Sequence, residues 1–215
     1  MTETTAGSII LRAALLLVCG AGVSSVVLRR KNGFMNAGGL LYYTIQSNLA
    51  VMLTTAVYLA YSLIPAAVPR ALDVLRFVVL VGITVTFLGF WALLAPFMEK
   101  EYLLSLNNLL VHTLAPVLFA MDFFLFDRSA PIAAAEVPWA TAMPLLYFIF
   151  SIAHAAINPK LQFQDGGRYP YFFLDLDKYG WFGFRKGIGV FWWALFFTGL
   201  TLGLGYLYRF LQTVI

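Results

Sequence analysis

Windows of about 20 consecutive apolar residues recur along the whole chain, and this feature restricts the possible fold more than any other. A helix needs about 20 such residues to cross about 30 Å of hydrocarbon at 1.5 Å per residue. Charged residues make up 11% of the chain, whereas water-soluble domains are about one quarter charged. The pattern predicts an all-α, multi-pass membrane protein, a six-helix transmembrane bundle in a single domain, residues 1–215. The six predicted spans are residues 8–28, 40–63, 72–95, 104–127, 138–157 and 185–210.

The segments between the predicted spans are short, except for the fifth, which runs from Asn158 to Phe184 and is rich in aromatic residues. Aromatic rings with a polar tip favour the membrane interface, so this long connector is either an interfacial belt or a lid over a site inside the bundle. The acidic N-terminus lacks a small-residue cleavage site, and we expect the first window to be retained as a span. Lys and Arg are more frequent on the side of the first, third and fifth connectors, which predicts that this side is cytoplasmic. The formal charge of +4 fits a membrane surface and does not indicate nucleic acid as a partner.

Polar residues gather on one face of three predicted spans. Thr44, Ser47 and Asn48 fall at i, i+3 and i+4, and Asn108 lies one helical turn before His112. Thr44 and His112 enter from the same side, at depths that differ by about 6 Å at 1.5 Å per residue. The third face, on the fifth span, consists of Tyr147, Ser151, His154 and Asn158. Polar faces in a membrane bundle turn inward, which predicts a shared site.

Each of these residues also has a purely structural interpretation. A threonine in a membrane helix often bonds the carbonyl four residues earlier, and asparagine often joins neighbouring helices. Arg12, Arg76 and Asp122 are expected to pair or to extend their side chains towards water near helix ends.

Three stretches carry a resemblance to a known family: YYTIQSNL at 42–49, NNLLVHTLAP at 107–116 and YPYFFLD at 169–175. In this order they resemble the androgen-induced and androgen-dependent membrane proteins. Those are multi-span threonine hydrolases that cleave fatty acid esters of hydroxy fatty acids. The chain is most similar to short prokaryotic relatives, which implies a lipid ester substrate and a location in a prokaryotic inner membrane. It departs from the animal proteins in having Gln46 and Ser47 where those carry an aromatic residue before the asparagine.

The resemblance implies that Thr44 is the nucleophile and that His112 is its base, with no cofactor and no metal. A threonine hydroxyl becomes a good nucleophile only when a base takes its proton. The oxyanion that forms on the ester needs hydrogen-bond donors, for which Asn48 and Asn108 are the candidates. The remaining candidates for positioning the substrate or the base are Ser47, His154 and Asp175.

Two other classes of function fit the composition. A haem held between His112 and His154 would make an electron-transfer protein, although their predicted depths differ by about 9 Å. A small-molecule transporter is the second alternative, although no clear inverted repeat is present. The sequence leaves the oligomeric state open.

Overall fold

The apolar windows of the sequence form helices in the computed structural model, which describes residues 6–28, 30–31, 34–35, 37–64, 66–126, 131–163, 166–184 and 187–214. Five helical runs are long and apolar enough to cross a membrane. They are Ala6–Val27, Arg70–Phe97, Leu106–Phe126, Ala134–Ile157 and Val190–Val214. The all-helical class predicted from the sequence is therefore confirmed, and five helical runs have the length and apolar composition that a membrane span needs.

The second predicted span, residues 40–63, corresponds to α2 (Tyr43–Leu63), which has 21 residues but is not one of these five. Its sequence includes the polar residues of the YYTIQSNL stretch together with two further threonines, and these lower its hydropathy. The six-span bundle as a whole therefore stays a prediction.

Several of these runs are composed of shorter elements. The first half of the described chain contains α1 (Ala6–Val27), β1 (Arg30–Lys31), β2 (Phe34–Met35), η1 (Ala37–Leu41), α2, α3 (Arg70–Gly89), η2 (Phe90–Leu94) and η3 (Ala95–Phe97). The second half contains α4 (Lys100–Leu103), α5 (Leu106–Leu109), η4 (Leu110–Leu114), α6 (Ala115–Phe126), η5 (Ala134–Thr141), α7 (Ala142–Ile157), η6 (Phe172–Leu174), α8 (Leu176–Tyr179) and α9 (Val190–Val214). Strands β1 and β2 pair antiparallel, and each has only two residues.

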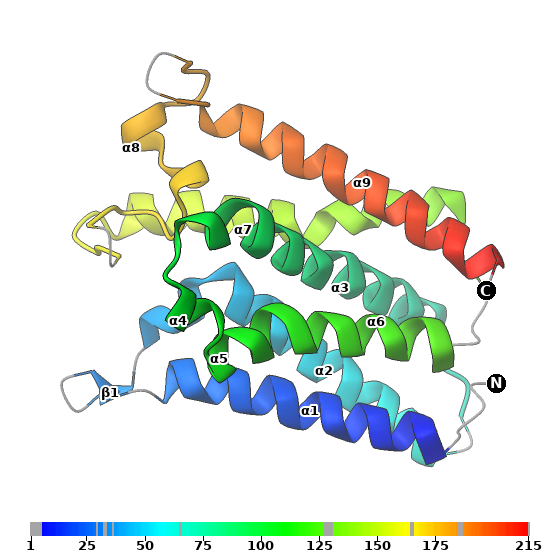
Figure 1. The fold of residues 1–215 in the computed structure, drawn as a ribbon. Helices are drawn as coiled ribbons and strands as arrows, with labels where there is room; N and C mark the ends of the chain where they lie inside the picture. Colours follow the sequence, from blue (N-terminus) through cyan, green and yellow to red (C-terminus); the bar gives the residue numbers. More distant parts are fainter. Residues whose placement is uncertain are drawn as a thin grey trace.

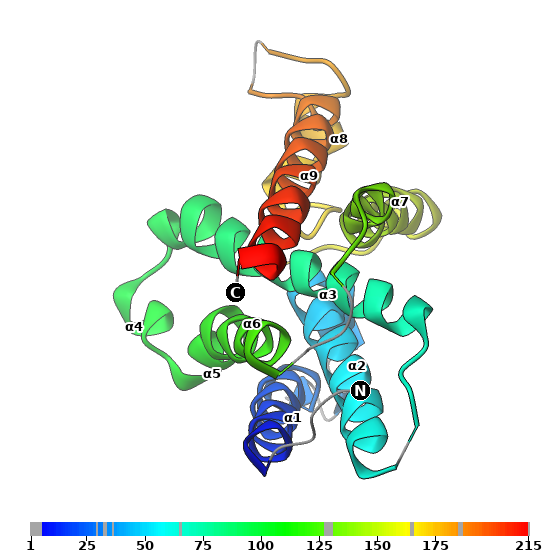
Figure 2. The same ribbon diagram turned by 90° about the vertical axis from the view of Figure 1, so that its right-hand side faces the viewer.

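Four helices, α1, α2, α3 and α6, pack around the main apolar core, and α7 and α9 lie against α3 on the outside of this group (Figure 2). The core is made of side chains such as Leu15, Val51, Leu80, Ile83 and Phe119, each fully buried. β1, α4 and α8 lie at one end of the molecule, and both chain termini lie at the other (Figure 1). We call the end with β1, α4 and α8 the loop end.

A carboxylate joins two arginines inside the four-helix group, near the end opposite the loop end. Asp122 of α6 accepts from Arg12 Nε of α1 at 3.0 Å and from Arg76 Nη2 of α3. Arg12 also donates to the Tyr58 carbonyl of α2 at 3.3 Å, and the Arg76 guanidinium lies 4.1 Å from the Tyr58 ring centroid. Arg12, Arg76 and Asp122 are at most 1% exposed. These charges therefore pair with one another in the interior and do not extend to water.

Helix α9 is attached to the rest of the molecule mainly through its C-terminal half. A Cβ at Gly205 would lie 3.0 Å from Val137 and 3.2 Å from Ala140, both in η5, so glycine permits the close approach of the two elements. The N-terminal half of α9 contacts aromatic residues of the long connector, including the pair of Trp193 with Phe173 at 5.8 Å.

Asp122→Asn should destabilise the protein by about 3–5 kcal/mol, because removing one partner of a buried ion pair leaves its charge uncompensated. The measurement is thermal unfolding in detergent micelles. Glu136→Gln is the matched control, since Glu136 pairs with Arg70 at a partly exposed position and such a pair contributes about 1 kcal/mol or less. Equal losses in the two variants would contradict a special role for the buried cluster.

Candidate functional site

The structure brings together the two residues that the sequence analysis proposed as nucleophile and base. Thr44 is the second residue of α2, and His112 lies in η4, on the helical run that begins at Leu106. The distance from Thr44 Oγ1 to His112 Nε2 is 3.2 Å, which is within hydrogen-bond reach. The side chain of His112 is buried, and that of Thr44 is partly buried.

The contact made by the other ring nitrogen of His112 determines which nitrogen carries the proton. Nδ1 lies 3.3 Å from the backbone carbonyl of Asn108, one helical turn earlier. A carbonyl only accepts hydrogen bonds, so Nδ1 carries the proton and Nε2 presents its lone pair to the Thr44 hydroxyl. Phe90 stacks on the imidazole with ring centroids 3.8 Å apart and an angle of 20°, which holds the ring plane.

His112 and Phe90 both lie in π-helical turns, η4 and η2 respectively. The same two turns are joined a second time, because Trp91 Nε1 donates to Thr113 Oγ1 at 3.1 Å. A π turn widens the helix and changes the direction of its side chains, and such turns are frequent at functional sites. The sequence analysis did not identify them, since FWALL and LVHTL contain no residue type that marks a π turn.

Asn48 holds the start of α2 against the turn that contains His112. Its Nδ2 donates to the Thr44 carbonyl at 2.8 Å and to the Val111 carbonyl at 3.1 Å, which uses both amide hydrogens. The predicted role of Asn48 as an oxyanion donor does not agree with this geometry, because no side-chain hydrogen remains for a substrate. Asn48 is a residue that positions Thr44 relative to His112.

Asn108 and Ser47 also join elements around the pair. Asn108 Nδ2 donates to the Leu103 carbonyl at 3.0 Å, so its side chain is directed to the preceding turn. Ser47 Oγ donates to the Thr44 carbonyl at 3.0 Å and lies 2.7 Å from Thr86 Oγ1 of α3. Both residues are buried and support the backbone near the site.

His154 and Asp175 are not brought to Thr44 and His112. His154 lies near the end of α7, where its ring is 5.7 Å from that of Phe150. Asp175 caps α8 by accepting from the Lys178 backbone N–H at 3.0 Å. The group that accepts a hydrogen bond from His112 Nδ1 is the Asn108 carbonyl, a role for which Asp175 was a candidate. Both nitrogens of His112 are engaged, which does not favour the alternative of an iron held between the two histidines.

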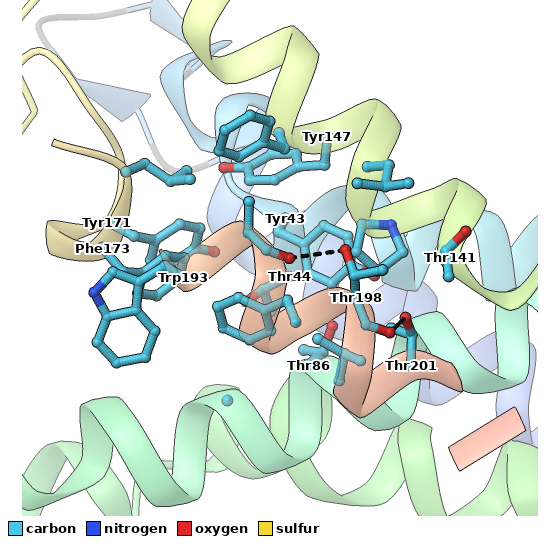
Figure 3. A pocket seen from close by; sticks show the side chains of 18 of the residues that line it. Tyr43, Thr44, Thr86, Thr141, Tyr147, Tyr171, Phe173, Trp193, Thr198 and Thr201 are labelled. Carbon is cyan, nitrogen blue, oxygen red and sulfur yellow. Dashed lines mark hydrogen bonds between the residues drawn. The ribbon is translucent and has the colours of Figure 1, made fainter. Parts of the chain in front are cut away.

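A narrow pocket opens beside Thr44 and contains about 760 Å³ of space, including its open mouth. Tyr171, Phe173 and Trp193 lie at one side of the view in Figure 3, and Thr141, Thr198 and Thr201 at the other. Its walls come from α2, α3, η2, η5, α7, α9 and the long connector. Phe90 lines the pocket as well, so one ring contacts both the cavity and the base.

Most hydroxyl groups in the pocket wall are already engaged with the protein backbone. Thr141, Thr198 and Thr201 donate to carbonyls of their own helices at 2.8–2.9 Å. Tyr43 donates to the Gly82 carbonyl and Tyr147 to the Leu41 carbonyl. The pocket is therefore apolar along most of its surface, and its polarity is concentrated where Thr44 lies.

The connector contributes one further polar group at this place. Tyr171 lines the same pocket as Thr44, and its phenol lies close to the start of α2. The sequence analysis placed Tyr171 in the long connector and in the YPYFFLD stretch, but gave it no individual role, because a connector has no helical period that would indicate where a side chain points.

Comparisons of the chain with protein-family models, with curated proteins and with solved structures each find no match. The resemblance described from the three sequence stretches therefore stays a prediction. The site has to be interpreted from its own geometry.

Asn48→Ala should lower the free energy of unfolding by about 1–3 kcal/mol, since it removes a buried donor from two carbonyls. Thermal unfolding in micelles measures the loss. Gln46→Ala serves as the control on the same helix, because the Gln46 side chain bonds the Leu40 carbonyl at an exposed position. A larger loss in the Gln46 variant would contradict the positioning role of Asn48.

Proposed function

We propose that this protein is a membrane-embedded hydrolase of lipid carboxylic esters, with Thr44 as the nucleophile and His112 as the general base. The observation that carries the proposal is the 3.2 Å contact between Thr44 Oγ1 and His112 Nε2 at the wall of an apolar pocket. A hydroxyl, a base within hydrogen-bond reach and a third group that orients the base form the arrangement that activates hydroxyl nucleophiles. Here the third group is the Asn108 carbonyl.

The reaction consists of two acyl transfers. Thr44 Oγ1 attacks the ester carbonyl carbon while its proton moves to His112 Nε2. The tetrahedral intermediate collapses, the C–O bond to the alcohol breaks, and the leaving oxygen takes the proton from His112. Water then attacks the acyl-threonine with the same base, which releases the fatty acid and restores the Thr44 hydroxyl. The expected partner is thus a lipid ester taken from the surrounding membrane lipids.

The proposal places the reaction inside the membrane, in a six-span bundle in which α2 is the additional span. Helix α2 has 21 residues and carries most of its polar side chains where other helices cover them, including Ser47 and Asn48 at 0% exposure. A helix of this kind is compatible with a bilayer because its polar groups are satisfied by neighbouring helices. The location we propose is a prokaryotic inner membrane, with the whole chain acting as one domain.

The long connector is proposed to cover the site from the loop end. Its residues Tyr171 and Phe173 line the pocket, and Tyr171 contacts the Tyr42 ring at 5.9 Å. A cover of this kind would exclude water from the acyl chain and admit substrate from the lipid side.

Thr44→Ala should abolish hydrolysis of p-nitrophenyl decanoate in mixed micelles and labelling by a fluorophosphonate probe, because it removes the attacking oxygen. Thr54→Ala is the control, since Thr54 lies on the same helix and bonds only carbonyls of its own turn. Full turnover by the Thr44→Ala variant would contradict the proposed mechanism.

His112→Ala should reduce turnover by about 10²–10⁴-fold, the typical contribution of a general base. Steady-state hydrolysis of the same ester measures the effect. His154→Ala is the matched histidine control and should have a much smaller effect, because that ring lies away from Thr44 near the end of α7. The reversed ranking of the two variants would refute the assignment of the base.

Gly89→Leu should discriminate against long acyl chains. Gly89 lines the pocket, and a Cβ there would meet no atom within 4 Å, so a larger side chain would fill the cavity without strain. Each buried methylene contributes about 0.8 kcal/mol, so displacing about three of them from the pocket costs about 2.4 kcal/mol. This loss corresponds to a fall of about 50-fold in kcat/KM for the long-chain ester. The measurement compares p-nitrophenyl decanoate with the acetate, which should be affected little.

Gly203→Leu provides the control for this substitution. A Cβ at Gly203 also meets no atom within 4 Å, but Gly203 is not among the residues that line the described pocket. An equal loss for both esters in the Gly89 variant, or the same chain-length effect in both variants, would contradict the pocket as the acyl site.

A further inference from the structure

Ester hydrolysis at Thr44 requires a hydrogen-bond donor for the oxygen that becomes negatively charged, and the two asparagines do not supply it. Both amide hydrogens of Asn48 are used by backbone carbonyls, and the Asn108 amide is directed to Leu103. Neither asparagine lines the pocket in which the ester would lie. The donor therefore has to come from a residue that does line this pocket.

Tyr171 is such a residue, and it lines the pocket together with Thr44. Its phenol lies close to the start of α2, where Thr44 is the second residue. The other tyrosines of the pocket wall, Tyr43 and Tyr147, donate to backbone carbonyls instead. In the described part of the chain, Tyr171 is thus the pocket tyrosine whose hydroxyl makes no such bond to a backbone carbonyl.

Aromatic neighbours hold the Tyr171 ring in place. Phe173 stacks on it with centroids 5.0 Å apart and an angle of 6°. Tyr42 and Tyr147 contact it edge-on at 5.9 Å and 6.1 Å. A donor that is fixed before the reaction need not reorganise when charge develops, and this preorganisation is the main source of oxyanion stabilisation.

The protonation state of Tyr171 suits a donor. Burial raises the pKa of Tyr171 to about 12, although hydrogen bonds with Thr44 act in the opposite direction. The phenol therefore keeps its proton at neutral pH.

We propose that Tyr171 is a further catalytic residue, whose O–H donates to the carbonyl oxygen of the ester as Thr44 attacks. The inference rests on the proposed function. When the Thr44 Oγ1–carbon bond forms, the π electrons of the C=O bond move to its oxygen, and the Thr44 proton moves to His112. The oxyanion and Thr44 Oγ1 are then bonded to the same carbon, so a donor in the pocket wall beside Thr44 is close to the oxyanion. Tyr171 keeps its proton throughout, and its hydrogen bond weakens when the C=O bond re-forms.

Tyr171→Phe tests this role, because it removes the hydroxyl and keeps the ring that packs on Phe173. We expect kcat for p-nitrophenyl decanoate to fall by about 10²–10³-fold, the loss typical of one oxyanion donor, with KM nearly unchanged. The rate of fluorophosphonate labelling at Thr44, located by mass spectrometry, should fall in parallel. Thermal unfolding in micelles checks that the variant remains folded.

Tyr169→Phe is the matched control from the same segment. Tyr169 is also buried, but it is not among the residues that line the pocket, so its hydroxyl should not affect kcat. An equal fall of kcat in both variants would show a structural effect of the connector and overturn the inference, and so would a change in KM alone.

Two outcomes separate this inference from the proposed function. If Tyr171→Phe is fully active while Thr44→Ala is inactive, Tyr171 is not the donor and the threonine mechanism stands. If the Thr44→Ala variant is fully active, the proposed function fails and the role of Tyr171 fails with it.

Discussion

The carboxylate of Asp122, shared between the guanidinium groups of Arg12 and Arg76, sets the relative heights of the helices that carry the site. Charges in the interior of a membrane protein are costly unless they are paired, so these three residues have to meet. They come from α1, α3 and α6, and Arg12 also binds the Tyr58 carbonyl of α2. One ionic cluster thereby fixes all four helices of the main core at one end.

The opposite end of the same helices carries Thr44 and His112, the proposed catalytic pair. Ser62, which accepts from Arg12, lies 18 residues after Thr44 on α2, or about 27 Å along a helix at 1.5 Å per residue. Over that length a small error in helix height or rotation would separate Thr44 from His112. Asn48 and Ser47 remove this freedom locally, because they bond the His112 turn and α3 respectively. The polar face of α2 therefore serves both to hold the helix and to present one hydroxyl.

The remaining elements enclose the pocket beside Thr44 and contribute less to the main core. Helices α7 and α9 expose many apolar side chains, as a lipid-facing surface does, and with the connector they enclose the pocket beside Thr44. The division matches the chemical requirement. In the proposed reaction, the nucleophile and base need a rigid support, whereas an apolar substrate needs a cavity near the lipid.

The helices, their apolar surfaces and the faces on which Thr44, Ser47, Asn48, Asn108 and His112 lie can be predicted from the sequence, because length, hydropathy and helical period are local properties. The expected depths of Thr44 and His112 and the family resemblance also predict the pairing of these two residues. Packing between distant segments decides that Asn48 binds backbone carbonyls, that His154 lies apart and that Tyr171 lines the pocket together with Thr44. Helical period gives a side chain's face but not the neighbour it meets. The π turns around Phe90 and His112, and the path of the connector, arise from packing between segments distant in the chain, which no local pattern encodes.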